Sequence, residues 1–148
     1  TEEFERLYRA YQKEISLSEG VEEFLDYCKA HNIFIAILTN GRTKSQYAKV
    51  IALDLHRWFD DDHIFISGGI GYQKPDPMAF QYIEKMFSLN PEETWYIGDT
   101  YEADVVGADG AGWHTVWFNH RNRERLENCA DVTVRSIEEL SRFIKERS

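Results

Sequence analysis

The chain has 148 residues, of which 43% are apolar and 29% are charged, a composition typical of a globular protein with a core of its own. Its 26 acidic and 17 basic residues give a net charge of −9, which argues against broad binding to nucleic acid or to anionic membranes. The two cysteines, Cys28 and Cys129, fit neither a zinc site nor a disulfide framework, so the cytoplasm is the expected compartment.

The first third of the chain predicts two helices, a buried strand and a third helix. Residues 2–15 carry an apolar stripe at helical spacing, and a second helix is predicted after a break at residues 16–20. Residues 33–38 are apolar throughout, which is typical of a strand covered on both faces, as in a parallel sheet. A third helix is predicted over residues 43–54, with Ile51 on its inner face.

The rest of the chain continues the alternation of strands and helices. Asp76 and Pro77 are a typical N-cap and first residue of a helix, and Ser136 with Glu139 forms a capping box before the last helix. The predicted strands are 63–67, 94–98, 114–118 and 132–134, a glycine-rich loop follows residue 67, and the predicted helices are 76–88, 102–111 and the segment after 136. This alternation predicts one α/β domain with a Rossmann-like, mostly parallel sheet and helices on both faces.

Polar side chains follow three of the predicted strands. Thr39 and Asn40 come after the first strand, Lys74 follows the glycine-rich loop, and Asp99 and Asp104 follow the strand at 94–98. Ligands of open parallel sheets bind beyond the carboxyl ends of the strands. We therefore expect these five residues to gather at one edge of the sheet.

The residue types at this edge suit a phosphate group and a hard cation. Two carboxylates, Asp99 and Asp104, with water are suitable ligands for Mg²⁺. The Lys74 ammonium is a good clamp for phosphate, and the Thr39 hydroxyl and the Asn40 backbone amide are donors for phosphate oxygens. Each residue also has a structural alternative: Asp99 as a turn residue, Asp104 as a helix-dipole partner, Lys74 as a surface lysine, and Thr39 with Asn40 as a helix-entry turn.

Three strings of the sequence resemble the second, third and fourth motifs of the haloacid dehalogenase superfamily: ILTNG, QKPDP and WYIGDTYEAD, in this order. The resemblance implies that Thr39 and the Asn40 amide bind the transferring phosphoryl group and that Lys74 neutralises it. It implies further that Asp99 ligates Mg²⁺ and that Asp104 is a second or water-mediated ligand. By the same resemblance, Lys74 and Asp99 are the catalytic residues that this chain contributes.

The first motif of that superfamily, a strand that ends in Asp-x-Asp, is not found in this chain. The one Asp-x-Asp present, Asp60 to Asp62, follows no apolar strand and is typical of a solvated acidic turn. The resemblance implies that the nucleophilic aspartate lies outside the chain and that residues 1–16 are a remnant of the helical cap domain. Residues 17–148 would then form the hydrolase core.

The absent motif has a consequence for folding. By resemblance its strand lies between the strand that ends at Leu38 and the strand that ends at Gly98, and each backbone group left unpaired there costs about 1–3 kcal/mol. We therefore expect the slot to be filled by a missing N-terminal segment or a neighbouring chain, or to close by direct pairing of the two strands.

The resemblance predicts a magnesium-dependent phosphatase that acts on a small phosphorylated metabolite through an aspartyl-phosphate. The chain by itself is expected to be inactive because it lacks the nucleophile. Two alternatives remain open: a phosphomutase on the same scaffold and a non-catalytic, truncated module that binds phosphate or magnesium. Neither nucleic acid nor a membrane is an expected partner, and the substrate is not predicted because its choice lies largely in the cap domain.

Overall fold

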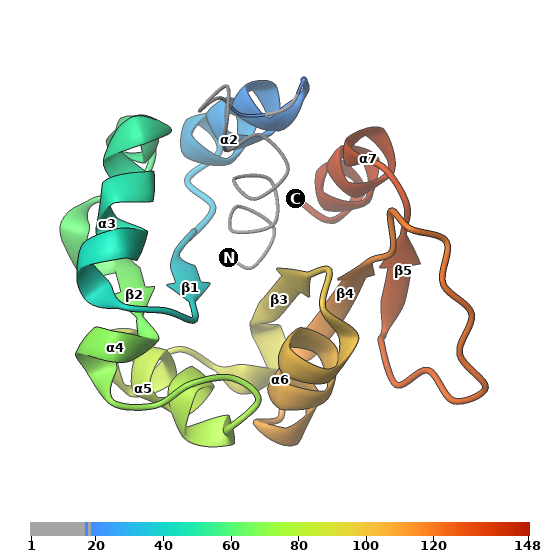
Figure 1. The fold of residues 1–148 in the computed structure, drawn as a ribbon. Coiled ribbons are helices and arrows are strands. Elements are labelled where there is room, and N and C mark those ends of the chain that lie inside the picture. Colours follow the sequence, from blue (N-terminus) through green and yellow to red (C-terminus); the bar gives the residue numbers. More distant parts are fainter. Residues whose placement is uncertain (1–16, 18) are drawn as a thin grey trace.

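The computed structural model describes residues 17 and 19–148, so the predicted cap remnant at residues 1–16 lies outside the described residues. Strands and helices alternate along the described chain as far as β4, which is followed by β5 with no helix between them (Figure 1). The strands are β1 (Ile37–Thr39), β2 (Ile64–Ile66), β3 (Trp95–Gly98), β4 (His114–Phe118) and β5 (Val132–Val134). The α-helices are α2 (Val21–Ala30), α3 (Thr43–Ala52), α4 (Ser67–Ile70), α5 (Pro77–Phe87), α6 (Gly107–Gly110) and α7 (Ile137–Arg147). Shorter helical segments are the 3₁₀ turns Leu55–Arg57, Asp61–His63 and Pro91–Glu93 and the π-helical segment Tyr101–Val106.

The helices of residues 17 and 19–148 include none with the length and apolar character of a membrane-spanning segment.

The predicted caps account for where several helices begin. The Asp76 carboxylate accepts a hydrogen bond from the Met78 amide at 2.9 Å, with Pro77 as the first residue of α5. The Ser136 hydroxyl accepts from the Glu139 amide at 3.1 Å at the start of α7. These bonds satisfy backbone amides that have no partner within the helix.

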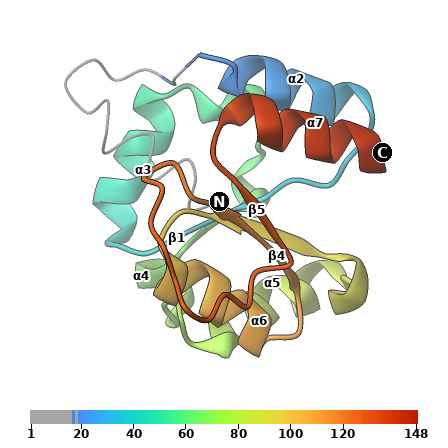
Figure 2. The ribbon, with the colours of Figure 1, turned by 90° about the vertical axis from the view of Figure 1, so that its right-hand side faces the viewer.

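All strand pairs are parallel, and helices cover both faces, which confirms the predicted fold class. Figure 2 shows α2 and α7 side by side on one face and α5 and α6 on the other. Because neighbouring strand residues point to opposite faces, Ile37 of β1 packs in the core beneath α2 and α7, and Leu38 packs in the core beside α5. The strands therefore lie between two of the apolar clusters of the described residues.

The described strands form two sheets rather than one. β1 pairs only with β2, and β3 pairs with β4, which pairs with β5, so no ladder joins β1 to β3 in residues 17 and 19–148 (Figure 1). A cavity of about 1000 Å³ separates the two sheets, and Leu25, Leu38, Tyr96 and Ile144 are among the residues that line it. Direct pairing of β1 with β3 is thus not seen in this part of the chain, and occupation of the slot by another segment or chain stays a prediction.

Several elements differ from their predicted bounds. β1 begins at Ile37 rather than residue 33, because only residues 37–39 find a neighbouring strand. The glycine-rich loop contains the short helix α4, and the helix predicted over 102–111 divides into the π-helical segment and α6. The prediction that Ile51 faces inward is wrong, since its side chain is 60% exposed.

Candidate functional site

Lys74 is buried at the edge of the strands where the site was predicted. Its side chain is 0% exposed, and Nζ donates to Asp104 Oδ1 at 3.1 Å, to the Tyr96 hydroxyl at 3.1 Å and to the Leu38 carbonyl at 3.3 Å. Burial lowers the pKa of Lys74 to about 8, although the charges of Asp104 and Asp99 oppose this shift. The surface-lysine alternative is therefore wrong, and the ammonium is held in a fixed position.

Asn40 fixes the backbone that carries this lysine. Its amide nitrogen Nδ2 donates to the Lys74 carbonyl, and its Oδ1 accepts from the Lys74 amide, both at 3.0 Å. The Asn40 side chain thus binds both backbone polar groups of a residue that lies 34 positions away in the sequence. Because Asn40 follows β1 directly, this pair of bonds places Lys74 at the carboxyl end of that strand.

Thr39 lies on the same edge as the last residue of β1, and it is buried. Its hydroxyl accepts a hydrogen bond from Gln46 Nε2 at 2.7 Å, and Gln46 also donates to the Asn40 carbonyl at 3.2 Å. A hydroxyl that accepts one bond keeps its own proton for a second partner. Thr39 can therefore still donate to a phosphate oxygen.

Asp104 is enclosed on every side. Its Oδ1 accepts from Lys74, its Oδ2 accepts from the Thr100 amide at 2.9 Å, and its side chain is 0% exposed. Burial raises the pKa of Asp104 to about 6, against the opposing effect of the Lys74 charge. Gly98 is required beside it, because a Cβ there would lie 2.3 Å from Asp104 Oδ2.

Asp99 directly follows β3, and its carboxylate faces side-chain nitrogens of a histidine and an arginine. His120 Nε2 lies 3.3 Å and Arg121 Nη2 lies 3.8 Å from Asp99 Oδ2, and the Asp99 side chain is 1% exposed. The Trp117 indole donates to the Asp99 backbone carbonyl at 3.3 Å, which ties this turn to β4. The negative charge of Asp99 also acts to raise the pKa of Lys74, so both carboxylates and the ammonium belong to one site.

The structure thus brings the predicted residues to one edge and adds others that the sequence did not indicate. These additions are Gln46, Tyr96, His120 and Arg121. His120 and Arg121 follow β4 closely, so the rule about strand ends would have found them. Gln46 and Tyr96 lie within a helix and a strand, and no sequence pattern singles them out.

Asp60 and Asp62 do not form the Asp-x-Asp nucleophile motif. Both side chains are exposed in the 3₁₀ turn region before β2, and Asp62 accepts from His63 Nδ1 at 2.7 Å. The predicted solvated turn is therefore confirmed.

A magnesium ion fits the donor set at this edge. Carboxylate oxygens are hard ligands of the kind that Mg²⁺ prefers. Both oxygens of Asp104 already accept hydrogen bonds, which favours contact through water, and the Asp99 carboxylate supplies further oxygen donors at the same edge.

Parallel strands with a buried lysine and two aspartates at their carboxyl ends define an α/β protein of the class that binds its ligands beyond the strand ends. The chain belongs to the haloacid dehalogenase-like hydrolase family, whose model matches residues 1–118. This match confirms the resemblance on which the sequence predictions rest.

Similar proteins are named as phosphatases. Glyceraldehyde 3-phosphate phosphatase of Pyrococcus furiosus is 30% identical over 125 residues, which are 82% of this chain and 51% of that protein. Phosphoserine phosphatase of Thermus thermophilus is 34% identical over 120 residues, 80% of this chain and 47% of that protein. The chain thus spans about half the length of the curated relatives it matches.

Solved structures show the same fold. A HAD phosphatase from Thermococcus onnurineus superposes with a TM-score of 0.76 at 27% identity, over 86% of this chain and 58% of that one. The protein YfnB of Bacillus subtilis, in a structure bound to magnesium, gives a TM-score of 0.78 at 29% identity, over 92% of this chain and 59% of that one.

Proposed function

We propose that this chain is the core of a magnesium-dependent phosphatase that hydrolyses small phosphate monoesters. The observation that carries the proposal is the buried Lys74 ammonium, held beside Asp104 and near Asp99 at the carboxyl edge of the sheet. The phosphatase names of the relatives and the magnesium bound in YfnB support it.

The residues of the chain have separate tasks in this proposal. The Thr39 hydroxyl and the Asn40 amide donate to oxygens of the phosphoryl group, and Lys74 offsets the negative charge that grows on it in the transition state. Asp99 and Asp104 are the residues that would hold Mg²⁺, Asp99 directly and Asp104 through water. When bound, Mg²⁺ would neutralise phosphate charge and orient the group for in-line attack.

Lys74 is suited to this task because its position is determined before the substrate arrives. The Asn40 amide fixes its backbone, and three acceptors fix its Nζ. A preorganised charge stabilises a transition state without a further cost of reorganisation. The bond to the Leu38 carbonyl, the longest of the three at 3.3 Å, is the one that a phosphate oxygen would replace most easily.

The covalent step belongs to an aspartate outside this chain. In the proposed order of steps, its carboxylate attacks phosphorus while the bond from phosphorus to the alcohol oxygen breaks, and the second aspartate of the same motif gives its proton to that oxygen. Water then gives a proton back to the second aspartate and attacks the aspartyl-phosphate, which releases phosphate and the free carboxylate. This division of labour predicts that the chain binds and orients phosphate but does not turn over without that aspartate.

Phosphate release from an aryl phosphate tests the proposal on the protein expressed from its complete gene. We expect activity that requires Mg²⁺ and falls at least about a hundredfold in Asp99→Asn. Asp109→Asn is the matched control, since Asp109 is an exposed aspartate of the neighbouring helix α6. Phosphate binding without release would favour the non-catalytic module, and transfer between sugar positions would favour the phosphomutase.

A further inference from the structure

The turn after β4 lies directly beside the proposed magnesium ligand Asp99. Within this turn, residues 119–123, His120 and Arg121 both face the Asp99 carboxylate, at 3.3 Å and 3.8 Å from Oδ2. Figure 2 shows the long connection that continues from β4 to β5 past this end of the sheet. The turn thus brings a guanidinium and an imidazole to a buried carboxylate.

A single buried asparagine holds this turn rigid. Asn119 is 3% exposed, its Nδ2 donates to the Arg123 carbonyl at 2.9 Å, and its Oδ1 accepts from the Arg123 amide at 3.0 Å. The Asn119 amide donates to the Val134 carbonyl of β5 at 2.7 Å, and Asn122 takes a left-handed conformation with φ 52°. The backbone of Arg121 is therefore fixed, and only its side chain can move away.

The two members of the Asp99–Arg121 pair differ in exposure. The Asp99 side chain is 1% exposed, and the Arg121 side chain is 50% exposed. A buried carboxylate needs a compensating charge, and an exposed guanidinium loses little when it exchanges that partner for water. The Arg121 guanidinium can therefore move into solvent while the Asp99 carboxylate keeps its buried position.

We propose that Arg121 is a displaceable counter-ion of Asp99 that weakens Mg²⁺ binding and moves away when the metal binds. This inference rests on the proposed function, because it takes Asp99 as a metal ligand. A guanidinium near Asp99 Oδ2 and a divalent ion on the same carboxylate repel each other. The metal must therefore either displace Arg121 or bind against its charge.

Magnesium titration calorimetry of Arg121→Gln tests the inference on the protein expressed from its complete gene. We expect Mg²⁺ to bind about threefold to tenfold more tightly than in the wild type, because one repelling charge is removed and its half-exposed position limits the effect through screening. The difference should shrink as NaCl is raised, since salt screens the exposed guanidinium. Arg121→Lys keeps the charge and should bind Mg²⁺ much as the wild type does.

Arg123→Gln is the matched control. It removes the same charge from the same turn, and within the described part of the chain no ion pair joins the Arg123 side chain to a carboxylate. We expect its Mg²⁺ affinity to stay within about twofold of the wild type. A general charge effect would shift both variants alike and would overturn the inference.

The outcomes separate this inference from the proposed function. If the wild type binds Mg²⁺, Asp99→Asn abolishes binding and Arg121→Gln leaves the affinity unchanged or weaker, the inference fails and the metal site stands. If neither the wild type nor Arg121→Gln binds Mg²⁺, the magnesium site fails and the inference fails with it.

Discussion

Replacement of Lys74 by methionine tests the electrostatic centre of the site. The change keeps most of the side-chain volume and removes the ammonium that contacts Asp104, in a place where both side chains are 0% exposed. The Leu38 carbonyl keeps a partner, because the Tyr96 hydroxyl still donates to it at 3.0 Å. The main loss is thus the counter-ion of Asp104.

The size of this loss depends on pH. Breaking a buried ion pair by removing one partner costs about 3–5 kcal/mol while the remaining charge persists. Asp104 can escape this cost by binding a proton, since burial already raises its pKa to about 6, and without Lys74 the pKa rises further. A carboxyl group with a raised pKa stabilises the fold at low pH, and this contribution is lost as pH rises through the folded-state pKa.

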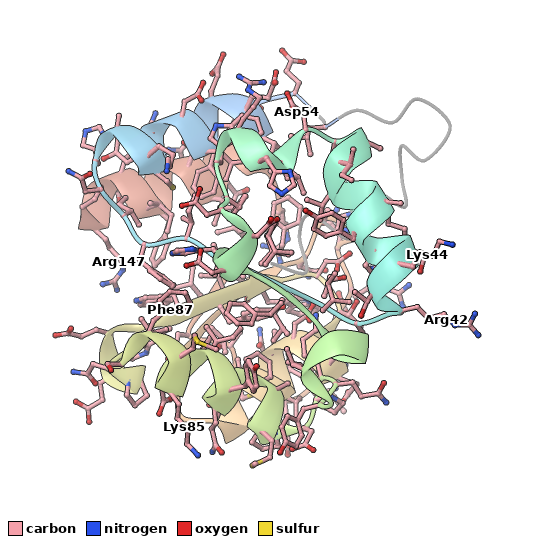
Figure 3. All side chains as sticks on the ribbon, turned by 90° about the vertical axis from the view of Figure 1, so that its left-hand side faces the viewer. Arg42, Lys44, Asp54, Lys85, Phe87 and Arg147 are labelled. Carbon is pink, nitrogen blue, oxygen red and sulfur yellow. The ribbon has the colours of Figure 1, made fainter. Side chains whose placement is uncertain are left out.

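We therefore expect Lys74→Met to lower the free energy of unfolding by about 3–5 kcal/mol at pH 7, where both members of the pair are mostly charged, and by about 1 kcal/mol or less at pH 5. Urea denaturation followed by tryptophan fluorescence at both pH values measures the two losses. Lys85→Met is the matched control, because Lys85 is exposed on α5 and points into solvent (Figure 3). Equal losses at both pH values, or a loss no larger than that of the control, would refute the reasoning.

Three further predictions concern the geometry and charge around Lys74. Asn40→Ala removes both bonds to the Lys74 backbone and should lower kcat about tenfold to a hundredfold in steady-state assays, whereas an effect on KM alone would contradict a positioning role. Gly98→Ala would place a Cβ 2.3 Å from Asp104 Oδ2 and should cost about 1–3 kcal/mol of stability in denaturation experiments. Gly110→Ala is its control, since the added Cβ would meet only Pro77 Cγ at 3.7 Å. The pH–rate profile should be bell-shaped, falling below about pH 6 as Asp104 binds a proton and above about pH 8 as Lys74 loses one, and a flat profile would show that the pair is not required in its charged form.

The edge of the sheet was predictable because strand ends are visible in the sequence. Apolar runs indicate β1 and β3, and parallel connection places the residues that follow them together. Thr39, Asn40 and Lys74 were therefore expected at one edge, and the hydrogen bonds from Asn40 to Lys74 show them there. The length of β1 was less predictable, because the start of a strand depends on where its neighbour begins.

The partners of each site residue were not predictable in the same way. Tyr96 and Gln46 act through side chains on a strand and a helix, and their contacts arise only when distant segments pack together. The burial of Asp104, and with it the raised pKa, also depends on the whole surrounding structure.

The sequence by itself therefore determined the class of this protein: an alternating α/β chain whose strand ends carry a hydroxyl, an ammonium and two carboxylates. Hydrophobic periodicity identifies the strands and helices, and the helices between successive strands imply a parallel sheet. Both features can be recognised in short segments of the sequence. Only the tertiary structure decided which charges meet. Ion pairs such as Arg121 with Asp99 depend on distances across the fold, and burial, which sets their strength, is a property of the folded molecule.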